Sequence, residues 1–180
     1  MRAYQIVYAD PPWKYGNSGT RANAKSHYPC MATDDIIALP ETDDTFPAFA
    51  DDAILFLWTT PPMLFEGLKI CEGWGFVYKT IAFAWVKQTQ EGGIYLGIGN
   101  YTRSNHELCL IAKSGKGLPR KDNTISNVQL AKRLGHSEKP HLFRELIERM
   151  YGDVKRVELF ARRTSPGWDT WGNQIEAELF

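Results

Sequence analysis

The fold is decided by the stretch Ile6-Val7-Tyr8-Ala9-Asp10-Pro11-Pro12-Trp13. Four apolar residues in an unbroken run predict a strand that is buried on both faces, as in the sheet of an α/β protein. The strand must end abruptly, because neither proline has an N–H to donate and Pro11 disfavours helical geometry at Asp10. We therefore expect a carboxylate at the carboxyl end of a buried strand, which is the edge where open α/β sheets bind ligands.

The groups at this strand end suit the methylation of an exocyclic amine. Adenine N6 is a poor nucleophile, because its lone pair is delocalised into the ring. Asp10 could accept one N–H and the backbone carbonyl of Pro11 or Pro12 the other, which would turn the lone pair outward. Trp13 could offer a face for base stacking, worth roughly 1–3 kcal/mol per base. A simple strand-ending turn would use the same residue types, and a second Pro-Pro pair occurs at Pro61-Pro62.

Asp10-Pro11-Pro12-Trp13 resembles the catalytic motif of the DPPW-type N6-adenine methyltransferases. This family includes the catalytic subunit of eukaryotic mRNA adenosine methyltransferase and many bacterial and phage relatives. Further motifs of the family follow in order, namely Lys139-Pro140, Glu158-Leu159-Phe160-Ala161-Arg162 and Gly172-Asn173-Gln174. The resemblance implies a Rossmann-like α/β methyltransferase fold with a mostly parallel sheet flanked by helices. It also implies catalysis by Asp10, Pro11, Pro12 and Trp13.

The resemblance further implies that S-adenosylmethionine is the cofactor. The residues implied to bind it are Asp10, Lys139, Glu158, Phe160, Arg162, Asn173 and Gln174. A cation such as Lys139 or Arg162 suits the methionine carboxylate. Amides at a helix start suit the ribose hydroxyls, and Glu158 could accept from one of them. Taken alone, Asn173 or Gln174 could equally be a helix cap or a surface amide, and the residues that hold the cofactor's adenine are left open.

Length and composition predict one globular domain over residues 1–180. No apolar run approaches the ~20 residues of a membrane span, and no signal-peptide pattern is seen, so we expect a cytoplasmic protein of a bacterial or phage-infected cell. Three cysteines, Cys30, Cys71 and Cys109, are an odd number without paired spacing, which indicates reduced thiols. The histidines do not form the paired Cys/His pattern of a zinc site, and no metal is expected.

The hydrophobic pattern predicts the order of the elements. We expect Thr33 to cap a short helix that Pro40 ends. A strand over 53–60, a helix from Pro61 to about 71 and a strand over 76–87 predict a right-handed crossover and a parallel pair. Further strands are expected over 106–113 and 154–160, with an amphipathic helix between them that follows Lys139-Pro140 and ends near Gly152. A final helix is expected to open with residues 171–174.

Charge is unevenly distributed along a chain of net charge zero. Residues 1–60 carry four Lys or Arg against eight Asp or Glu, whereas residues 101–165 carry fourteen against seven. The basic part could face a polyanion, although cations that merely solvate helix faces would give the same count. The candidate nucleic-acid-binding residues are Tyr15, Arg21 and Lys25 in a long loop over 14–31, and Lys116, Arg120, Lys121, Lys132 and Arg133 in an aperiodic segment over 114–135.

Two glycine-rich pieces do not carry a nucleotide motif. Gly97-Ile98-Gly99 lacks the third glycine and the following helix of a dinucleotide fingerprint. Ser114-Gly115-Lys116-Gly117 lacks the spacing of a Walker loop. Both are interpreted as loops.

The sequence therefore predicts methylation of adenine N6 in nucleic acid, with DNA preferred over RNA as the substrate. A target adenine in duplex DNA would have to be flipped out of the stack, because its amino group is buried in the base pair. Two alternatives remain, an RNA adenosine N6-methyltransferase and a catalytically silent nucleic-acid-binding subunit of the same fold. The intact Asp10 to Trp13 motif argues against the second. The oligomeric state and the recognised bases are left open.

Overall fold

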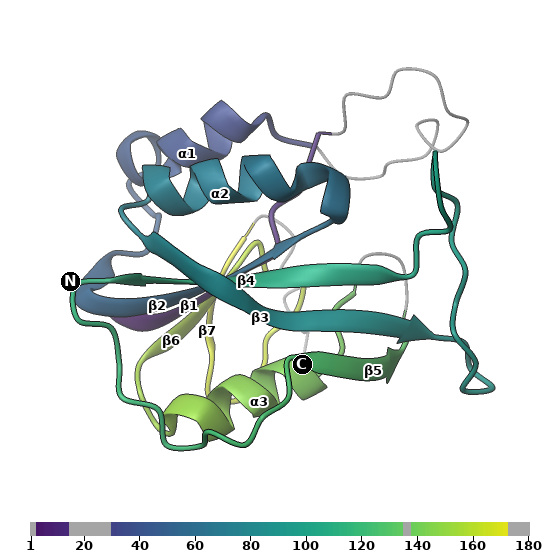
Figure 1. Cartoon of the computed structure of the whole chain (residues 1–180). Helices are drawn as coiled ribbons and strands as arrows, with labels where there is room; N and C mark the ends of the chain where they lie inside the picture. The colour runs from purple at the N-terminus through teal and green to yellow at the C-terminus, as the bar shows by residue number, and fades with distance from the viewer. Residues whose placement is uncertain (1–2, 15–29, 135–137, 173–180) are drawn as a thin grey trace, which may run out of the picture.

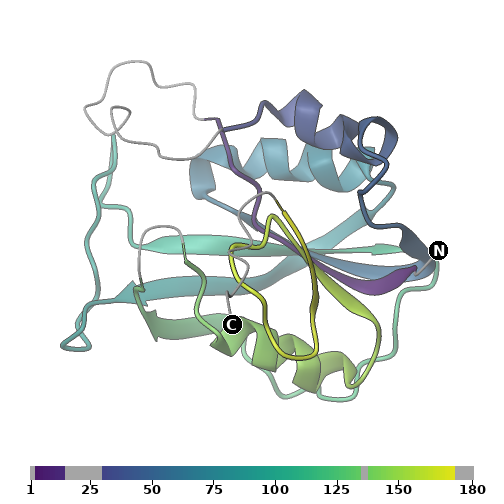
Figure 2. The same ribbon diagram turned by 180° about the vertical axis from the view of Figure 1, so that it is seen from behind.

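A seven-stranded sheet in the order β5-β3-β4-β2-β1-β6-β7 forms the centre of the computed structural model, which describes residues 3–14, 30–134 and 138–172 (Figure 1). The strands are β1 (Tyr4–Ala9), β2 (Phe49–Thr59), β3 (Val77–Gln88), β4 (His106–Ser114), β5 (Val128–Lys132), β6 (Arg156–Leu159) and β7 (Asp169–Trp171). The helices are α1 (Thr33–Thr42), α2 (Leu64–Gly73), which follows the short 3₁₀ helix η2 (Pro61–Met63), and α3 (Leu142–Tyr151). Figures 1 and 2 show α1 and α2 on one face of the sheet and α3 on the other.

Most strand pairs of this sheet are parallel, as predicted. The pairs β1–β2, β1–β6, β6–β7 and β3–β5 are parallel, and only β4 among the described strands runs against its neighbours. The predicted pairing of β2 with β3 is wrong, because β4 lies between them. A helical crossover is long enough to skip one strand position, and the chain after β3 returns to fill that position.

The strands at the centre of the sheet are buried on both faces. In β1, Val7 and Ala9 face the core under α1 and α2, whereas Ile6 and Tyr8 face the core under α3. All four side chains are at most 1% exposed. The apolar run that precedes Asp10 therefore supplies both hydrophobic cores, which confirms the prediction from its pattern.

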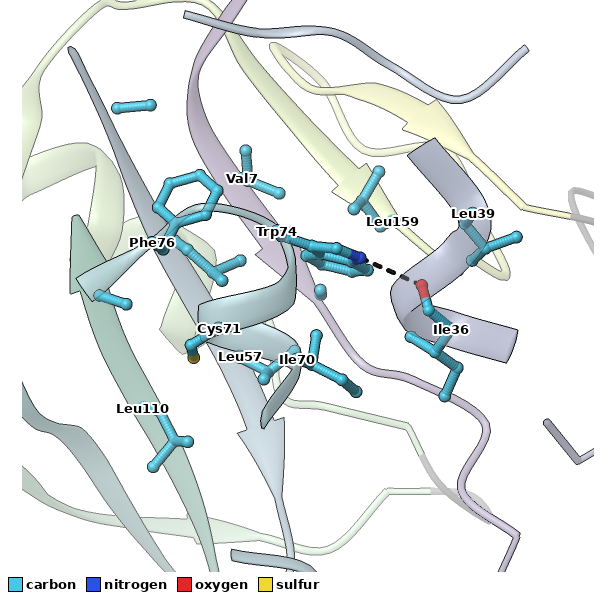
Figure 3. Close-up of a cluster of buried hydrophobic side chains, with 14 of the residues drawn as sticks. Val7, Ile36, Leu39, Leu57, Ile70, Cys71, Trp74, Phe76, Leu110 and Leu159 are labelled. Atoms are coloured by element: carbon cyan, nitrogen blue, oxygen red, sulfur yellow. Dashed lines mark hydrogen bonds between the residues drawn. The ribbon is translucent and has the colours of Figure 1, made fainter. Parts of the chain in front are cut away.

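The helix α1 continues through Pro40 to Thr42, so the prediction that Pro40 ends it is wrong. Proline cannot donate to the carbonyl four residues earlier, which here belongs to Ile36. The indole of Trp74 donates to that carbonyl at 3.1 Å, and Figure 3 shows this bond inside the core under α1 and α2. The predicted cap at Thr33 is also wrong, since Thr33 is the first helical residue and Ala32 precedes it without a side-chain cap.

Two further predictions differ from the structure. The segment over 114–135 contains the edge strand β5, whose residues alternate between exposed and half-buried and pair with β3. Trp171 ends β7 and does not open a helix, while Asn173 and Gln174 lie outside the described residues. The helix α3 does follow Lys139-Pro140, and it ends at Gly152, whose φ of 73° suits glycine.

Candidate active site

The carboxyl ends of β1, β2 and β6 meet at one edge of the sheet, because these three strands are parallel neighbours. Ala9 pairs with Leu57 of β2 and with Leu159 of β6, so Asp10 follows at the centre of this edge. The antiparallel β4 begins at the same edge, and β3 ends there, with Trp85 opposite Glu107. Charged residues from five separate parts of the chain can therefore meet beside Asp10.

A chain of alternating charges crosses this edge. Lys139, from the segment before α3, donates to Asp10 Oδ2 at 2.6 Å and lies 3.2 Å from Glu107 Oε2. Lys87 at the end of β3 donates to Glu107 Oε1 at 2.5 Å. The ammonium of Lys139 also lies 5.3 Å from the ring centroid of the buried Trp58. Two lysines and two carboxylates thus balance one another, and the indole ring supports the central cation.

Burial and charge set the protonation of this group. Burial by itself lowers the pKa of Lys139, but Asp10 and Glu107 outweigh it and raise the pKa, so Lys139 stays an ammonium. Burial would also raise the pKa of Glu107, yet Lys139 and Lys87 leave it below its ordinary value. Burial raises the pKa of Asp10, Lys139 opposes this, and the charge of Glu107 raises it further. The pKa of Asp10 is therefore shifted upward and that of Glu107 downward from their ordinary values.

The Asp10 carboxylate is the part of the group that a substrate can reach. Its side chain is 24% exposed, compared with 20% for Lys87, 15% for Glu107 and 7% for Lys139. Lys139 occupies only Oδ2, and the other carboxylate oxygen accepts no bond from the residues that the structure describes. The Asp10 carboxylate is therefore held through one oxygen and stays partly exposed at the sheet edge.

The residues after Asp10 are more enclosed than expected. Trp13 is 6% exposed and packs into the core with Ile36 and Leu39. The open stacking face expected at Trp13 is therefore absent from the described structure, because its bridge to Met31 turns this segment inward. The carbonyl of Pro11 accepts from the N–H of Trp13 at 2.9 Å, and that of Pro12 accepts from the N–H of Met31 at 2.8 Å. Each carbonyl keeps a second lone pair that could accept from a substrate.

The backbone after β6 closes against the end of β7. Phe160 has φ 60°, a left-handed conformation that is rare for a bulky residue and recurs at functional sites. Ala161 donates to the carbonyl of Trp171 at 3.1 Å. A Cβ on Gly172 would lie 2.8 Å from the Ala161 carbonyl oxygen, so only glycine permits this approach. The segment Glu158–Arg162 and the start of the segment Gly172–Gln174, both expected to bind the cofactor, are thereby brought together at this edge. The structure describes the second segment only up to Gly172.

Glu158 has a partner that the sequence did not predict. Arg144 of α3 donates to both of its carboxylate oxygens, at 2.7 Å and 2.6 Å. The guanidinium also lies 5.6 Å from the ring centroid of Tyr8. Glu158 is 7% exposed on the α3 face of the sheet, so its carboxylate joins α3 to β6 and is not aimed at an open cofactor site. Arg162 is half-buried, and its charge lowers the pKa of Asp10, which places it near the strand end.

The predicted nucleic-acid-binding residues are not all brought together. Lys132 and Arg133 lie at the carboxyl end of β5, on the same edge as Asp10. The segment of Lys116, Arg120 and Lys121 follows the end of β4 at the opposite edge, where the Lys116 N–H donates to Asp52 at 2.6 Å and the Lys121 N–H donates to the Met150 carbonyl at 2.7 Å. Tyr15, Arg21 and Lys25 lie outside the described residues.

The structure adds Glu107 and Lys87 to the candidate site. The sequence predicted strands over both segments and gave neither residue a role in the site. The available signal was a charged residue at the end of an otherwise apolar strand, Lys87 after Trp85-Val86 and Glu107 before Leu108-Cys109. Within the described ranges, no three His, Cys, Asp or Glu side chains are grouped to hold a metal ion. No helix in the part of the chain that the structure describes is long and apolar enough to cross a membrane.

Comparison with known proteins gives a consistent assignment. The family model MT-A70 matches residues 4–174. The chain is 35% identical over 193 residues to the type II methyltransferase M.MunI of Mycoplasma sp, a match that covers 97% of this chain and 78% of the relative. It is 29% identical to an N(6)-adenosine-methyltransferase MT-A70-like protein of Drosophila melanogaster and 28% identical to the N(6)-adenosine-methyltransferase catalytic subunit METTL3 of Homo sapiens. Both matches cover 96% of this chain but only 27% and 28% of those longer relatives.

Proposed function

The chain belongs to the MT-A70 family of methyltransferases, and we propose that it transfers a methyl group from S-adenosylmethionine to N6 of adenine in DNA. The observation that carries the proposal is the Asp10 carboxylate. It lies at the carboxyl end of β1, is held by a buried ammonium through one oxygen, and is partly exposed. This is the acceptor that an exocyclic amine requires in order to be oriented for methyl transfer.

We favour DNA as the substrate because of how much of each relative's length the chain matches. The type II methyltransferase is matched over most of its own length, whereas the N(6)-adenosine-methyltransferases are matched over about a quarter of theirs. Methylation of adenosine in RNA is the second candidate, because several relatives of that name align with nearly the whole of this chain. We place the protein in the cytoplasm of a bacterial or phage-infected cell, where such a substrate is met.

The residues at the sheet edge fit S-adenosylmethionine. Lys139 has three N–H donors, of which Asp10 and Glu107 take two, so the third could bind the methionine carboxylate. Arg162 could share that role, and Asn173 and Gln174 follow directly after Gly172, which approaches the backbone after β6. When bound, S-adenosylmethionine supplies an electrophilic methyl group on a positively charged sulfur.

In this proposal, residues of the chain orient adenine N6, the nitrogen that receives the methyl group. Asp10 accepts one N–H of the adenine amino group, and the second lone pair of the Pro11 or Pro12 carbonyl accepts the other. Lys139 fixes the carboxylate from behind, and Glu107, held by Lys87, keeps Lys139 in place. A preorganised acceptor of this kind contributes most where charge develops in the transition state.

One experiment tests the activity and separates the alternatives. Purified protein is incubated with S-adenosylmethionine labelled in the methyl group and with matched single-stranded and duplex DNA and RNA, which are then digested to nucleosides. We expect the label in N6-methyldeoxyadenosine, formed about 10²–10³ more slowly by the Asp10→Ala variant. Label in N6-methyladenosine alone would select the RNA alternative. Binding of nucleic acid without transfer of label would select the silent subunit.

A further inference from the structure

The connection between β3 and β4 is a narrow arm that leaves the sheet, and we call residues 93–105 the finger. Figures 1 and 2 show it extending beyond the end of β3 and returning to β4. Two large apolar side chains are presented at its end, since Ile98 is 93% exposed and Tyr101 is fully exposed. Ile94 and Leu96 of the finger are 45% and 55% exposed, so the finger carries a series of exposed apolar side chains, as an interaction surface does.

Hydrogen bonds fix the conformation of the finger at its base, which we call the foot and which lies next to β3 and β5. Tyr95 donates to the carbonyl of Lys87 at 2.8 Å, and Gly97 donates to that of Ser104 at 2.7 Å. The guanidinium of Arg133 lies 4.4 Å from the ring centroid of Tyr95 and clamps the foot to β5. A Cβ on Gly97 would lie 2.6 Å from the Ser104 carbonyl oxygen, and one on Gly99 would overlap the carbonyl of Thr102. The two glycines therefore let both sides of the finger lie against each other.

The finger begins at the candidate active site. Tyr95 of the finger bonds to Lys87 of β3, and Glu107 of β4 lies two residues after the end of the finger. Lys87 and Glu107 are both members of the charge chain that reaches Asp10. The base of the finger is predominantly cationic. Arg103 belongs to the finger and Lys132 and Arg133 lie beside it, whereas Glu91 in the preceding turn is an exposed carboxylate. An apolar tip above a basic foot is complementary to duplex DNA, whose phosphates lie outside its stacked bases.

The length of the finger also fits this partner. An extended chain from Tyr95 to Asn100 spans about 16 Å at roughly 3.3 Å per residue. Either groove of duplex DNA is about 8 Å deep, so a finger of this length reaches the base stack while its foot stays at the phosphates.

We propose that the finger is a wedge that enters duplex DNA, where Ile98 and Tyr101 fill the space left by the adenine that turns out toward Asp10. The proposal rests on the proposed function and adds the means of opening the duplex. Removing a base from the stack costs free energy, and other DNA-binding proteins insert apolar side chains between the base steps that they unstack. A single-stranded adenine needs no such help.

The test compares methylation of one long DNA in its duplex form and as a single-stranded circle. The double variant Ile98→Ser, Tyr101→Ser should lower kcat/KM on the duplex by about tenfold or more, because the opened stack loses its filling, and should leave the single-stranded rate within about twofold of wild type. Val77→Ser is the matched control, since Val77 is 60% exposed at the opposite end of β3. A second readout is permanganate oxidation of unpaired thymine, which wild-type protein should increase on bound duplex and the double variant should not.

The outcomes separate this proposal from the proposed function. A wild-type protein that methylates neither form of DNA removes the proposed function. An active wild type whose double variant matches it on the duplex overturns the wedge alone. Equal losses on both forms, with a change in sedimentation from a larger to a smaller species, would instead make the finger a contact between protein chains and would also overturn it.

Discussion

Lys139 donates a hydrogen bond to Asp10 at 2.6 Å across 129 residues of sequence. The contact joins the segment before α3 to the end of β1, and it turns a strand-end carboxylate into an oriented acceptor. Glu107 on the other side of Lys139 shares the same ammonium.

Removal of the Asp10 carboxylate should affect methyl transfer more than binding. We expect Asp10→Ala to lose about 10²–10³ in rate, the scale of one preorganised transition-state hydrogen bond. Asp10→Asn keeps an acceptor oxygen and should retain measurable activity. The measurement is single-turnover methylation at saturating cofactor and DNA, after both are shown to bind. An Ala variant at the wild-type rate would remove the catalytic assignment, and an Asn variant no faster than Ala would remove only the acceptor role.

Replacement of Lys139 should destabilise the fold as well as the site. In Lys139→Met, Asp10 and Glu107 lose their shared partner, and breaking a buried pair in this way costs about 3 kcal/mol. Urea unfolding at neutral pH measures the loss. Adding Asp10→Asn to Lys139→Met removes one of the unpaired charges and should recover part of it. If the loss of unfolding free energy in the double variant equals the sum of the losses in the two single variants, Asp10 and Lys139 are not coupled.

Activity should decline in acid at a pH above the ordinary Asp10 value of 3.8, because the pKa of Asp10 is raised. The ionised carboxylate accepts an N–H more strongly than the protonated acid does, so the rate falls as the pH drops through the raised pKa. Glu107 contributes to the rise, and Glu107→Gln should therefore move this limb of the profile to lower pH. The pH dependence of single-turnover rates tests the shift, with cofactor and DNA kept saturating at each pH. A limb that stays in place in Glu107→Gln would show that Glu107 does not act on Asp10.

Glu158 should matter for stability and not for cofactor affinity. In Arg144→Met, the Glu158 carboxylate stays buried without its partner, and we expect a loss of about 3 kcal/mol in the free energy of unfolding. Glu158→Gln removes the charge and should leave S-adenosylmethionine binding by calorimetry close to wild type. A loss of affinity of about 1 kcal/mol or more in Glu158→Gln, the scale of one lost hydrogen bond, would support the expected contact with the ribose instead.

The contribution of each basic residue to DNA binding should depend on the edge of the sheet at which it lies. If Lys132 and Arg133 contact phosphates, changing both to Gln should reduce the salt slope of duplex binding by nearly two units. The matched control, Lys116→Gln with Lys121→Gln, alters the same number of charges at the opposite edge and should leave the slope unchanged. Titrations from low to high salt, read by fluorescence anisotropy, compare the two pairs. A slope reduced only by the control pair would place the DNA on the other side of the molecule.

Local chemistry in the sequence was enough to predict the class of the fold and the centre of the site. The run from Ile6 to Ala9 is apolar without alternation, and a strand with that pattern must be covered on both faces. Asp10 is followed by Pro11 and Pro12, whose missing N–H groups end a strand whatever its surroundings. Both features depend on residues that are adjacent in the sequence. Such residues are neighbours before folding, so the features can be predicted without the tertiary structure.

The tertiary structure decided which distant groups became partners. Pro40 could stay inside α1 only because Trp74, 34 residues later, reaches the carbonyl that proline leaves without a donor. Trp13 became a core residue, and Glu158 was paired by Arg144, through packing that no local pattern encodes. The position of β4 between β2 and β3 brought Glu107 and Lys87 to Asp10. Each of these outcomes depends on strand order and burial, which arise from the free energy of the whole chain and not from any one segment.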